Sequence, residues 1–166
     1  MPNLTCSYCG KLFYLNQKDY HKTIKSLDSF CSVDCLINFI KSYVPREVKV
    51  KYWITRPMLV GDLIYDATLK MFFRSRYELL VYKLLKANNI EAEYESYTLK
   101  EGRKSYTPDF YIKDKDLFLE VKGVWQGGSK KKVEHWAKKI NLVLVPWYLY
   151  REMEASRYIN ILKSSL

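Results

Sequence analysis

The stretch that decides the fold is Tyr106-Thr-Pro-Asp-Phe-Tyr-Ile-Lys-Asp-Lys-Asp-Leu-Phe-Leu-Glu-Val-Lys-Gly-Val-Trp125. Two alternating runs flank the turn Asp114-Lys-Asp116, a pattern typical of a β-hairpin. Because strand side chains alternate, the apolar residues of each run share one face; these are Phe110 and Ile112, then Leu117, Leu119 and Val121. A hairpin buried on that face would present Asp109, Glu120 and Lys122 together.

This polar trio has the composition of a cation site. Mg²⁺ takes oxygen ligands, commonly one or two carboxylates with several waters, and such sites perform metal-assisted phosphodiester hydrolysis. The alternative is a solvated strand face, since Glu and Lys alternate on many exposed strands. The spacing alone favours the solvated face, and the neighbouring residues add support for a site. Pro108 stands at a strand start, where its missing N–H is tolerated, and Gly123 ends the second strand, where backbone can approach a ligand closely.

Length and charge narrow the class of protein. The 166 residues suit one domain of ordinary size with a small appendage, and 48% hydrophobic residues argue against disorder. The 28 basic against 18 acidic residues give a net charge of +10, which indicates a polyanionic partner, nucleic acid first, unless the protein is merely basic. No apolar run approaches the roughly 20 residues that cross a bilayer, and no secretory signal is visible. We therefore expect an intracellular protein with no membrane association and no small-molecule organic cofactor.

All four cysteines lie near the N-terminus, in two close pairs. Their spacing, Cys6-x2-Cys9 and Cys31-x3-Cys35, predicts a tetrahedral structural Zn²⁺ site, with disulfides or free thiols as the alternatives. Gly10 permits a tight turn after the first pair, and Ser32 can cap a helix that starts at the second. The pattern resembles treble-clef fingers, in which the last pair opens a helix. We therefore assign residues 1–44 to a four-cysteine zinc finger.

Residues 45–62 are expected to form a connector with accessory strands. Glu47–Ile54 alternates enough to be a strand, and Arg56-Pro57 marks a turn after it. The basic residues of this segment are candidates for phosphate contacts, with a solvated face as the alternative: Arg46, Lys49 and Lys51.

A helix is expected after a weak hairpin over residues 63–73. Ser75 followed by Glu78 is a capping box, and an apolar stripe of helical period follows it. Glu78 has two interpretations: it accepts the Ser75 amide as a capping residue, or it turns toward Asp109 and Glu120 as a metal ligand. Two residues at the start of this helix are further candidates for DNA contact: Arg74 and Arg76.

The rest of the chain alternates strands with helices. We expect the following elements around the hairpin: a strand over Glu91–Leu99, a turn over Lys100–Lys104, a basic loop over Gln126–Lys132, a helix over Val133–Ile140, a buried strand over Asn141–Pro146 and a terminal helix over Tyr148–Leu162. The basic loop carries three adjacent candidates for phosphate contact: Lys130, Lys131 and Lys132.

The order helix–strand–strand–strand–helix–strand, with acids on the first helix and the central hairpin, resembles the PD-(D/E)xK nuclease core. That core is an α/β restriction-endonuclease-like fold with a mixed central sheet flanked by helices, and we place it at residues 63–166. Four segments together resemble the phage endonuclease I family of Holliday-junction resolvases, and related phage nucleases of uncertain substrate: Phe73-Arg-Ser-x-x-Glu78, Glu93-Tyr-Glu95, Tyr106-Thr-Pro-Asp-Phe110 and Glu120-x-Lys-Gly-x-Trp125. The resemblance covers about residues 63–146.

The resemblance implies roles for the acidic residues. Glu78, Asp109 and Glu120 would hold one or two catalytic Mg²⁺ or Mn²⁺ ions, and the carbonyl of Val121 would complete the site. Lys122 would orient the attacking water or stabilise charge in the transition state. Crowded carboxylates repel one another unless a cation lies between them, which agrees with these roles.

Two departures limit the resemblance. The finger and residues 45–62 are no part of the resolvase pattern. The Lys100–Lys104 turn also looks shorter than the crossing by which resolvase subunits exchange elements, so a homodimer is left open. We expect a metal-dependent DNA endonuclease, either selective for branched DNA or targeted by the finger, acting in the host cytoplasm if it is phage-encoded. The alternative is a non-catalytic nucleic-acid-binding regulatory protein that retains a nuclease fold.

Overall fold

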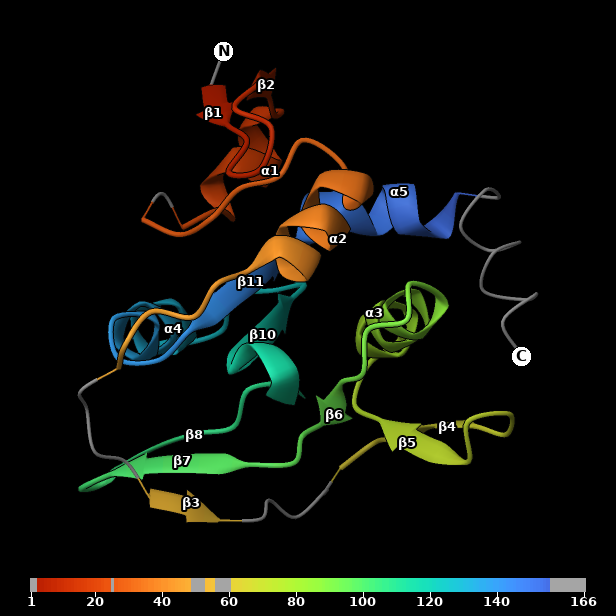
Figure 1. Cartoon of the computed structure of the whole chain (residues 1–166), viewed down its shortest axis with the longest axis vertical. Helices are drawn as coiled ribbons and strands as arrows, with labels where there is room; N and C mark the ends of the chain where they lie inside the picture. The colour runs from red at the N-terminus through yellow and green to blue at the C-terminus, as the bar shows by residue number, and fades with distance from the viewer. Residues whose placement is uncertain (1–2, 25, 49–52, 56–60, 156–166) are drawn as a thin grey trace.

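A central mixed sheet organises the fold. The computed structural model describes residues 3–24, 26–48, 53–55 and 61–155. Four strands lie in the order β11-β10-β9-β6 (Figure 1), where β6 covers Glu93–Tyr94, β9 Phe110–Ile112, β10 Leu117–Lys122 and β11 Leu142–Pro146. The pairs β6–β9 and β9–β10 are antiparallel, whereas β10 and β11 are parallel. The protein is therefore of the mixed α/β class, as the sequence predicts.

The predicted hairpin is confirmed as β9 and β10. Ile112 pairs with Leu117, and the turn between them is a 3-10 helix, η1 (Lys113–Lys115), closed by Asp116 in left-handed conformation with φ +43°. The alternative of a solvated strand face is excluded, because every residue of β10 from Leu117 to Val121 is buried.

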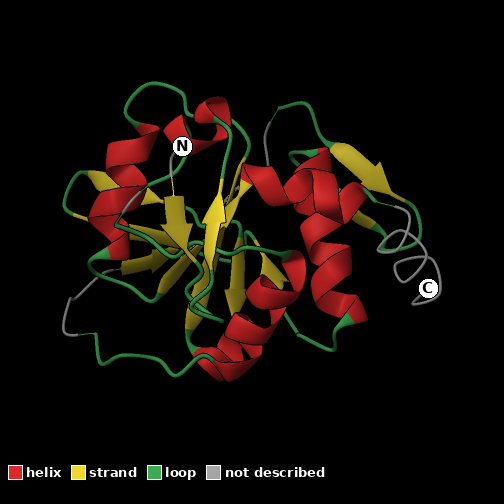
Figure 2. Ribbon diagram, turned by 90° about the horizontal axis from the view of Figure 1, so that it is seen from above, coloured by secondary structure: helices red, strands yellow, loops and turns green. Residues whose placement is uncertain are grey.

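Helices cover both faces of the sheet (Figure 2). One face packs against α2 (Val33–Ser42), α3 (Arg76–Ala87) and α5 (Tyr150–Glu154), with the strand residue Leu119 in the shared core. The other face packs against α4 (Ser129–Ala137), whose Trp136 lies in a second core with Phe118. This two-sided cover explains the near-continuous apolar sequence of β10 and β11, since neither face of a covered sheet meets water.

The N-terminal segment contains β1 (Asn3–Thr5), β2 (Leu12–Tyr14) and α1 (Gln17–His21) before α2. The predicted cap of α2 is confirmed, since Ser32 Oγ accepts a hydrogen bond from the Cys35 N–H at 3.2 Å. α2 does not stand apart from the rest. Leu36 and Ile40 are each 1% exposed, in the same core as α3 and the sheet.

Two hydrogen bonds also join the start of α2 to the C-terminal part of the chain. The Phe30 N–H donates to the Tyr148 hydroxyl at 3.1 Å, and the Val33 N–H donates to the Glu152 carboxylate at 3.0 Å. The hydrophobic core thus extends across the boundary predicted between residues 44 and 45, and that boundary stays a prediction.

Besides the antiparallel pair β1–β2, the described residues form two smaller sheets beside the central one. β3 (Trp53–Thr55), β7 (Thr98–Glu101) and β8 (Lys104–Tyr106) form one sheet in the order β3-β7-β8. β4 (Ile64–Asp66) and β5 (Met71–Phe73) form an antiparallel pair, which confirms the weak hairpin expected over residues 63–73.

The single strand predicted over Glu91–Leu99 is wrong. Glu95 has a left-handed backbone with φ +40°, which ends β6 and turns the chain into β7 in a different sheet. The turn predicted over Lys100–Lys104 is also shorter, because Lys100 pairs with Ser105 inside the β7–β8 ladder. Gly102 lies at its tip with φ +56°, where a side chain would be strained.

Three other expectations need correction or fall outside the description. Residues 47 and 48 are not in a strand, and Lys49, Lys51 and the predicted turn at residues 56–57 lie outside the described residues. The basic loop predicted over residues 126–132 is wrong at its end, because Lys130–Lys132 belong to the first turn of α4.

The C-terminal part of the structure agrees with the sequence-based prediction only in part. β11 is followed by a 3-10 helix, η2 (Trp147–Leu149), and then by α5. The predicted terminal helix beyond residue 155 lies outside the described residues. Among the residues that the structure describes, no helix has both the length and the apolar character needed to cross a membrane.

Candidate functional site

The four cysteines lie within ligand distance of one another. Their Sγ atoms are all within 4.8 Å, with Cys9–Cys31 at 3.6 Å and Cys31–Cys35 at 3.5 Å. Tetrahedral Zn²⁺ with bonds of about 2.3 Å places its sulfurs about 3.8 Å apart, whereas a disulfide needs about 2.05 Å. None of the four cysteines, Cys6 included, forms a disulfide. The cluster therefore suits a metal such as zinc and does not suit disulfides.

The backbone prepares this cluster for a cation. Gly10 turns the chain after the first pair with φ +72°. Burial alone would raise the pKa of the Cys6 thiol, but N–H groups of Cys9, Cys31 and Tyr8 outweigh burial and lower that pKa to about 6. Burial and the neighbouring thiols raise the pKa of Cys31 to about 12. Four thiolates cannot coexist here without a positive charge between them.

A second cluster consists of three buried carboxylates. Glu78 lies in the first turn of α3, Glu95 follows β6, and Asp109 precedes β9. Each offers an oxygen, and these oxygens all lie within 4.8 Å of one another. The structure thus brings together two of the predicted acids and one residue, Glu95, that the sequence did not single out.

Glu78 lies at the capped start of α3, but its carboxylate bonds the Ser75 hydroxyl instead of the Ser75 amide, and its role as a metal ligand stays a prediction. Ser75 is the N-cap of α3 and its Oγ accepts from the Glu78 N–H at 3.2 Å. The Glu78 carboxylate in turn accepts the Ser75 hydroxyl at 2.8 Å and the Tyr94 hydroxyl at 2.5 Å. Both donors are neutral, and they hold the carboxylate in place.

Glu95 carries an unsatisfied oxygen. Its Oε1 is paired with the Arg74 guanidinium, and the side chain is only 4% exposed. Its Oε2 has no hydrogen-bond partner among the described residues. Burying such an acceptor costs about 1–3 kcal/mol or more when it is charged, so a missing partner is the simplest account of its position.

The surroundings of Asp109 disfavour its charged form. Burial raises the pKa of its carboxyl well above the ordinary value, and the charges of Glu120 and Glu78 raise it further. The Val121 N–H donates to Asp109 Oδ2 at 2.5 Å and opposes the shift. Without a cation, the cluster therefore retains a proton that ordinary aspartates lose.

Glu120 and Lys122 form an ion pair beside this cluster. Lys122 Nζ lies 2.7 Å from Glu120 Oε1, and the Tyr106 hydroxyl donates to Glu120 Oε2 at 2.6 Å. Burial would lower the pKa of Lys122, but the charges of Glu120 and Asp109 outweigh it and raise that pKa. Both Glu120 oxygens are thus engaged, and Glu120 is not among the three acids that converge most closely.

The predicted DNA-contacting residues have diverse surroundings. Arg46 donates from its guanidinium to the carbonyls of Ala137 and Ile140, the latter at 2.7 Å, and so caps the end of α4. Lys130 donates to the Thr23 carbonyl at 3.0 Å. These contacts account for both residues without a phosphate. Four others are exposed, and phosphate contact remains a prediction for them: Arg74, Arg76, Lys131 and Lys132.

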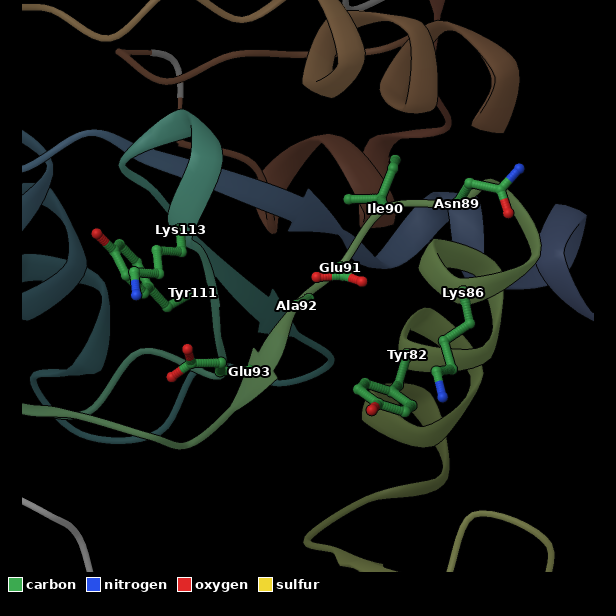
Figure 3. Close-up of a pocket in the computed structure, with 9 residues that line it drawn as sticks. All are labelled: Tyr82, Lys86, Asn89, Ile90, Glu91, Ala92, Glu93, Tyr111 and Lys113. Atoms are coloured by element: carbon green, nitrogen blue, oxygen red, sulfur yellow. The ribbon is translucent and has the colours of Figure 1, made fainter.

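A surface hollow of about 510 Å³ opens at the far end of α3 (Figure 3). Tyr82 and Lys86 of α3 form one side, and Lys113 of η1 lies on the other. Glu91 and Glu93 line it and are exposed. Its mixed charges give no preference for an anion or a cation, and it does not include the three converging acids.

Comparisons of the chain with protein-family models, with curated proteins and with solved structures found no match. The assignment of chemistry therefore rests on the two ligand clusters. The sequence contained Glu95 within the segment Glu93-Tyr-Glu95, but alternation gave no sign that the strand breaks there. Glu95 adopts a left-handed backbone, and a glutamate gives no sign of this conformation in the sequence.

Proposed function

We propose that this protein is a metal-dependent DNA endonuclease of the PD-(D/E)xK type, with a structural zinc finger. The observation that carries the proposal is the buried Glu95 Oε2, which has no partner among the described residues. It belongs to a carboxylate within 4.8 Å of those of Glu78 and Asp109. A cation accounts for the unsatisfied oxygen and for the crowding of three acids in a chain of net charge +10.

The residues present fit Mg²⁺ or Mn²⁺. All three converging groups are carboxylates, and hard cations of this kind prefer oxygen ligands. When bound, such an ion polarises a phosphoryl oxygen and lowers the pKa of a water molecule. The Val121 N–H fixes the orientation of Asp109, and the hydroxyls of Ser75 and Tyr94 fix that of Glu78.

The two roles expected for Lys122 can be separated on electrostatic grounds. Its pKa is raised, so at neutral pH it is an ammonium that cannot accept a proton from water. We assign it to stabilising negative charge on the phosphate as the bond to the leaving oxygen breaks. Glu120, which accepts the Tyr106 hydroxyl, holds the ammonium in place. Coordination by Glu120 and by the Val121 carbonyl stays a prediction.

The finger is proposed to influence where the DNA is cut. Four thiolates leave a zinc ion no open position for water or substrate, so the finger cannot supply chemistry. The indole N–H of Trp125 donates to the Lys22 carbonyl at 2.5 Å, and the Lys122 Nζ lies 5.9 Å from the Trp125 ring centroid. The segment after α1 is therefore in contact with the loop that follows Lys122.

The proposal is tested by incubating zinc-loaded protein with Mg²⁺ and linear duplex, four-way-junction or single-stranded DNA. Asp109→Asn and Glu95→Gln should each lose at least about 10–100-fold in cleavage rate, the loss typical of even an outer-shell partner of a metal. Glu93→Gln, which removes an exposed carboxylate two residues from Glu95, is the matched control and should cut normally. DNA binding by the wild type with no cleavage under Mg²⁺ or Mn²⁺ would instead support the non-catalytic alternative.

A further inference from the structure

A second hollow, of about 420 Å³, lies between β8 and α4. We call it the β8–α4 groove, and it is lined by Lys104, Ser105, Lys131, Lys132, His135 and Trp136. One wall comes from the β7–β8 hairpin and the other from the first two turns of α4. Segments distant in sequence thus converge on one depression.

The groove carries an excess of positive charge. Lys104, Lys131 and Lys132 are exposed, and none of them forms an ion pair with another described residue. Glu101, which pairs with Lys104 in the β7–β8 ladder, is already bound by Lys139 and by His135, the latter at 3.0 Å. The charge of the three lysines is therefore available to an anion from outside.

Buried side chains connect the groove to the Glu120–Lys122 ion pair. Trp136 is 1% exposed and stacks on Tyr106, with ring centroids 5.8 Å apart and an interplanar angle of 17°. The Tyr106 hydroxyl bonds Glu120, which holds Lys122. Lys132 Nζ lies 5.9 Å from the centroid of the Tyr106 ring. One tyrosine therefore separates the lysines of the groove from the ion pair at the candidate site.

We propose that the β8–α4 groove binds the sugar–phosphate backbone of the DNA on the α4 side of the candidate site. Three unpaired ammonium groups on two walls fit a repeating line of phosphates better than a single small anion, and the Ser105 hydroxyl adds a neutral donor. The assignment adds Lys104 to the contacts expected from sequence. It removes Lys130, whose ammonium is bound by the Thr23 carbonyl. This proposal rests on the proposed function in one respect, namely that the bound polymer is DNA.

The test measures binding rather than cleavage, so that the two proposals can fail separately. Zinc-loaded full-length protein is titrated into fluorescent duplex or single-stranded DNA by anisotropy, without Mg²⁺ and without chelator, at several salt concentrations. The test variant is Lys104→Ala/Lys131→Ala. The matched control is Lys41→Ala/Lys113→Ala, which removes two exposed lysines that line a different hollow beside α2 and η1.

Each lost phosphate contact flattens the slope of log affinity against log salt by about 0.9 on duplex DNA. The test variant should therefore show a slope flatter by about 1.8, which reduces the affinity lost between 50 and 200 mM salt by about 12-fold. The control should keep the wild-type slope. Circular dichroism and a melting curve show that each variant is folded, and the single variant Lys104→Gln, with about half the effect, provides an independent measurement.

Equal slopes for the test and control variants would overturn the proposal, because net charge alone would then explain binding. Competition by polyglutamate as effective as by unlabelled DNA would overturn it too, since the groove would then bind any acidic polymer. A flattened slope in a protein that never cleaves DNA would support the groove while the proposed enzyme activity fails.

Discussion

Adding Mg²⁺ should stabilise the wild-type protein and should not stabilise Asp109→Asn. The asparagine keeps an oxygen that can accept the Val121 N–H and removes one negative charge from the cluster. The Asp109→Asn variant therefore tests the effect of the carboxylate charge with little change in the shape of the side chain. The exposed Glu93→Gln changes net charge equally and serves as the control.

The size of the effect follows from mass action. An ion that binds only the folded state at 100 times its dissociation constant stabilises that state by about 2.7 kcal/mol. For a chain of this length, 1 kcal/mol shifts Tm by about 2–4 °C, so the expected rise is about 5–11 °C. Wild type and Glu93→Gln should both show it.

Without Mg²⁺, the stability of the wild type should fall below that of Asp109→Asn as pH rises. The folded-state pKa of Asp109 is raised, so the folded protein holds a proton that the unfolded chain releases near pH 3.9. This contribution to stability is complete below about pH 3.9 and is lost as pH rises through the higher folded-state value, at about 1.4 kcal/mol per unit of displacement. Asp109→Asn lacks this loss and should be more stable than wild type at pH 8.

The assay is a thermal melt of zinc-loaded protein from pH 5 to 8, with and without Mg²⁺, read by circular dichroism. An Asp109→Asn protein that gains as much from Mg²⁺ as wild type would refute the metal assignment. The electrostatic argument would be refuted if, without metal, the stability of the wild type did not fall relative to that of Asp109→Asn as pH rises.

Three further predictions concern the N-terminal segment. Elemental analysis should find about one zinc per chain, and a cysteine-to-serine change at any ligand should lower this content: Cys6, Cys9, Cys31 or Cys35. Ile40→Ala should cost about 2–5 kcal/mol in urea unfolding, because its side chain is buried in the core of α2, α3 and the sheet. The exposed Lys41→Ala should change little. A truncation starting at Pro45 should therefore be insoluble, and a truncated protein that folds cooperatively would show that α2 is dispensable.

The central hairpin could be predicted because its pattern is local. Alternation around the predicted Asp114–Asp116 turn indicated both strands, and Ser75 and Ser32 indicated the starts of α3 and α2. The cysteine cluster was predictable for the same reason, since the spacing of each pair reflects one turn or one helical start.

The remaining features depend on contacts that are distant in sequence. The sequence left a solvated face open as the alternative for Glu120, and packing of α4 against that side of the sheet excludes it. Lys130–Lys132 followed two glycines and were expected in a loop, although they form the first turn of a helix. Arg46 looked like a phosphate contact until the end of α4 was found beside it.

The conformation of Glu95 has a consequence for how this sequence responds to selection. At φ +40° a residue with a side chain costs about 1–2 kcal/mol relative to ordinary backbone, and glycine or asparagine avoids most of that cost. A library of variants screened only for folding should therefore replace Glu95 early. A library screened for metal-dependent cleavage should retain it, so the two screens should diverge first at this position.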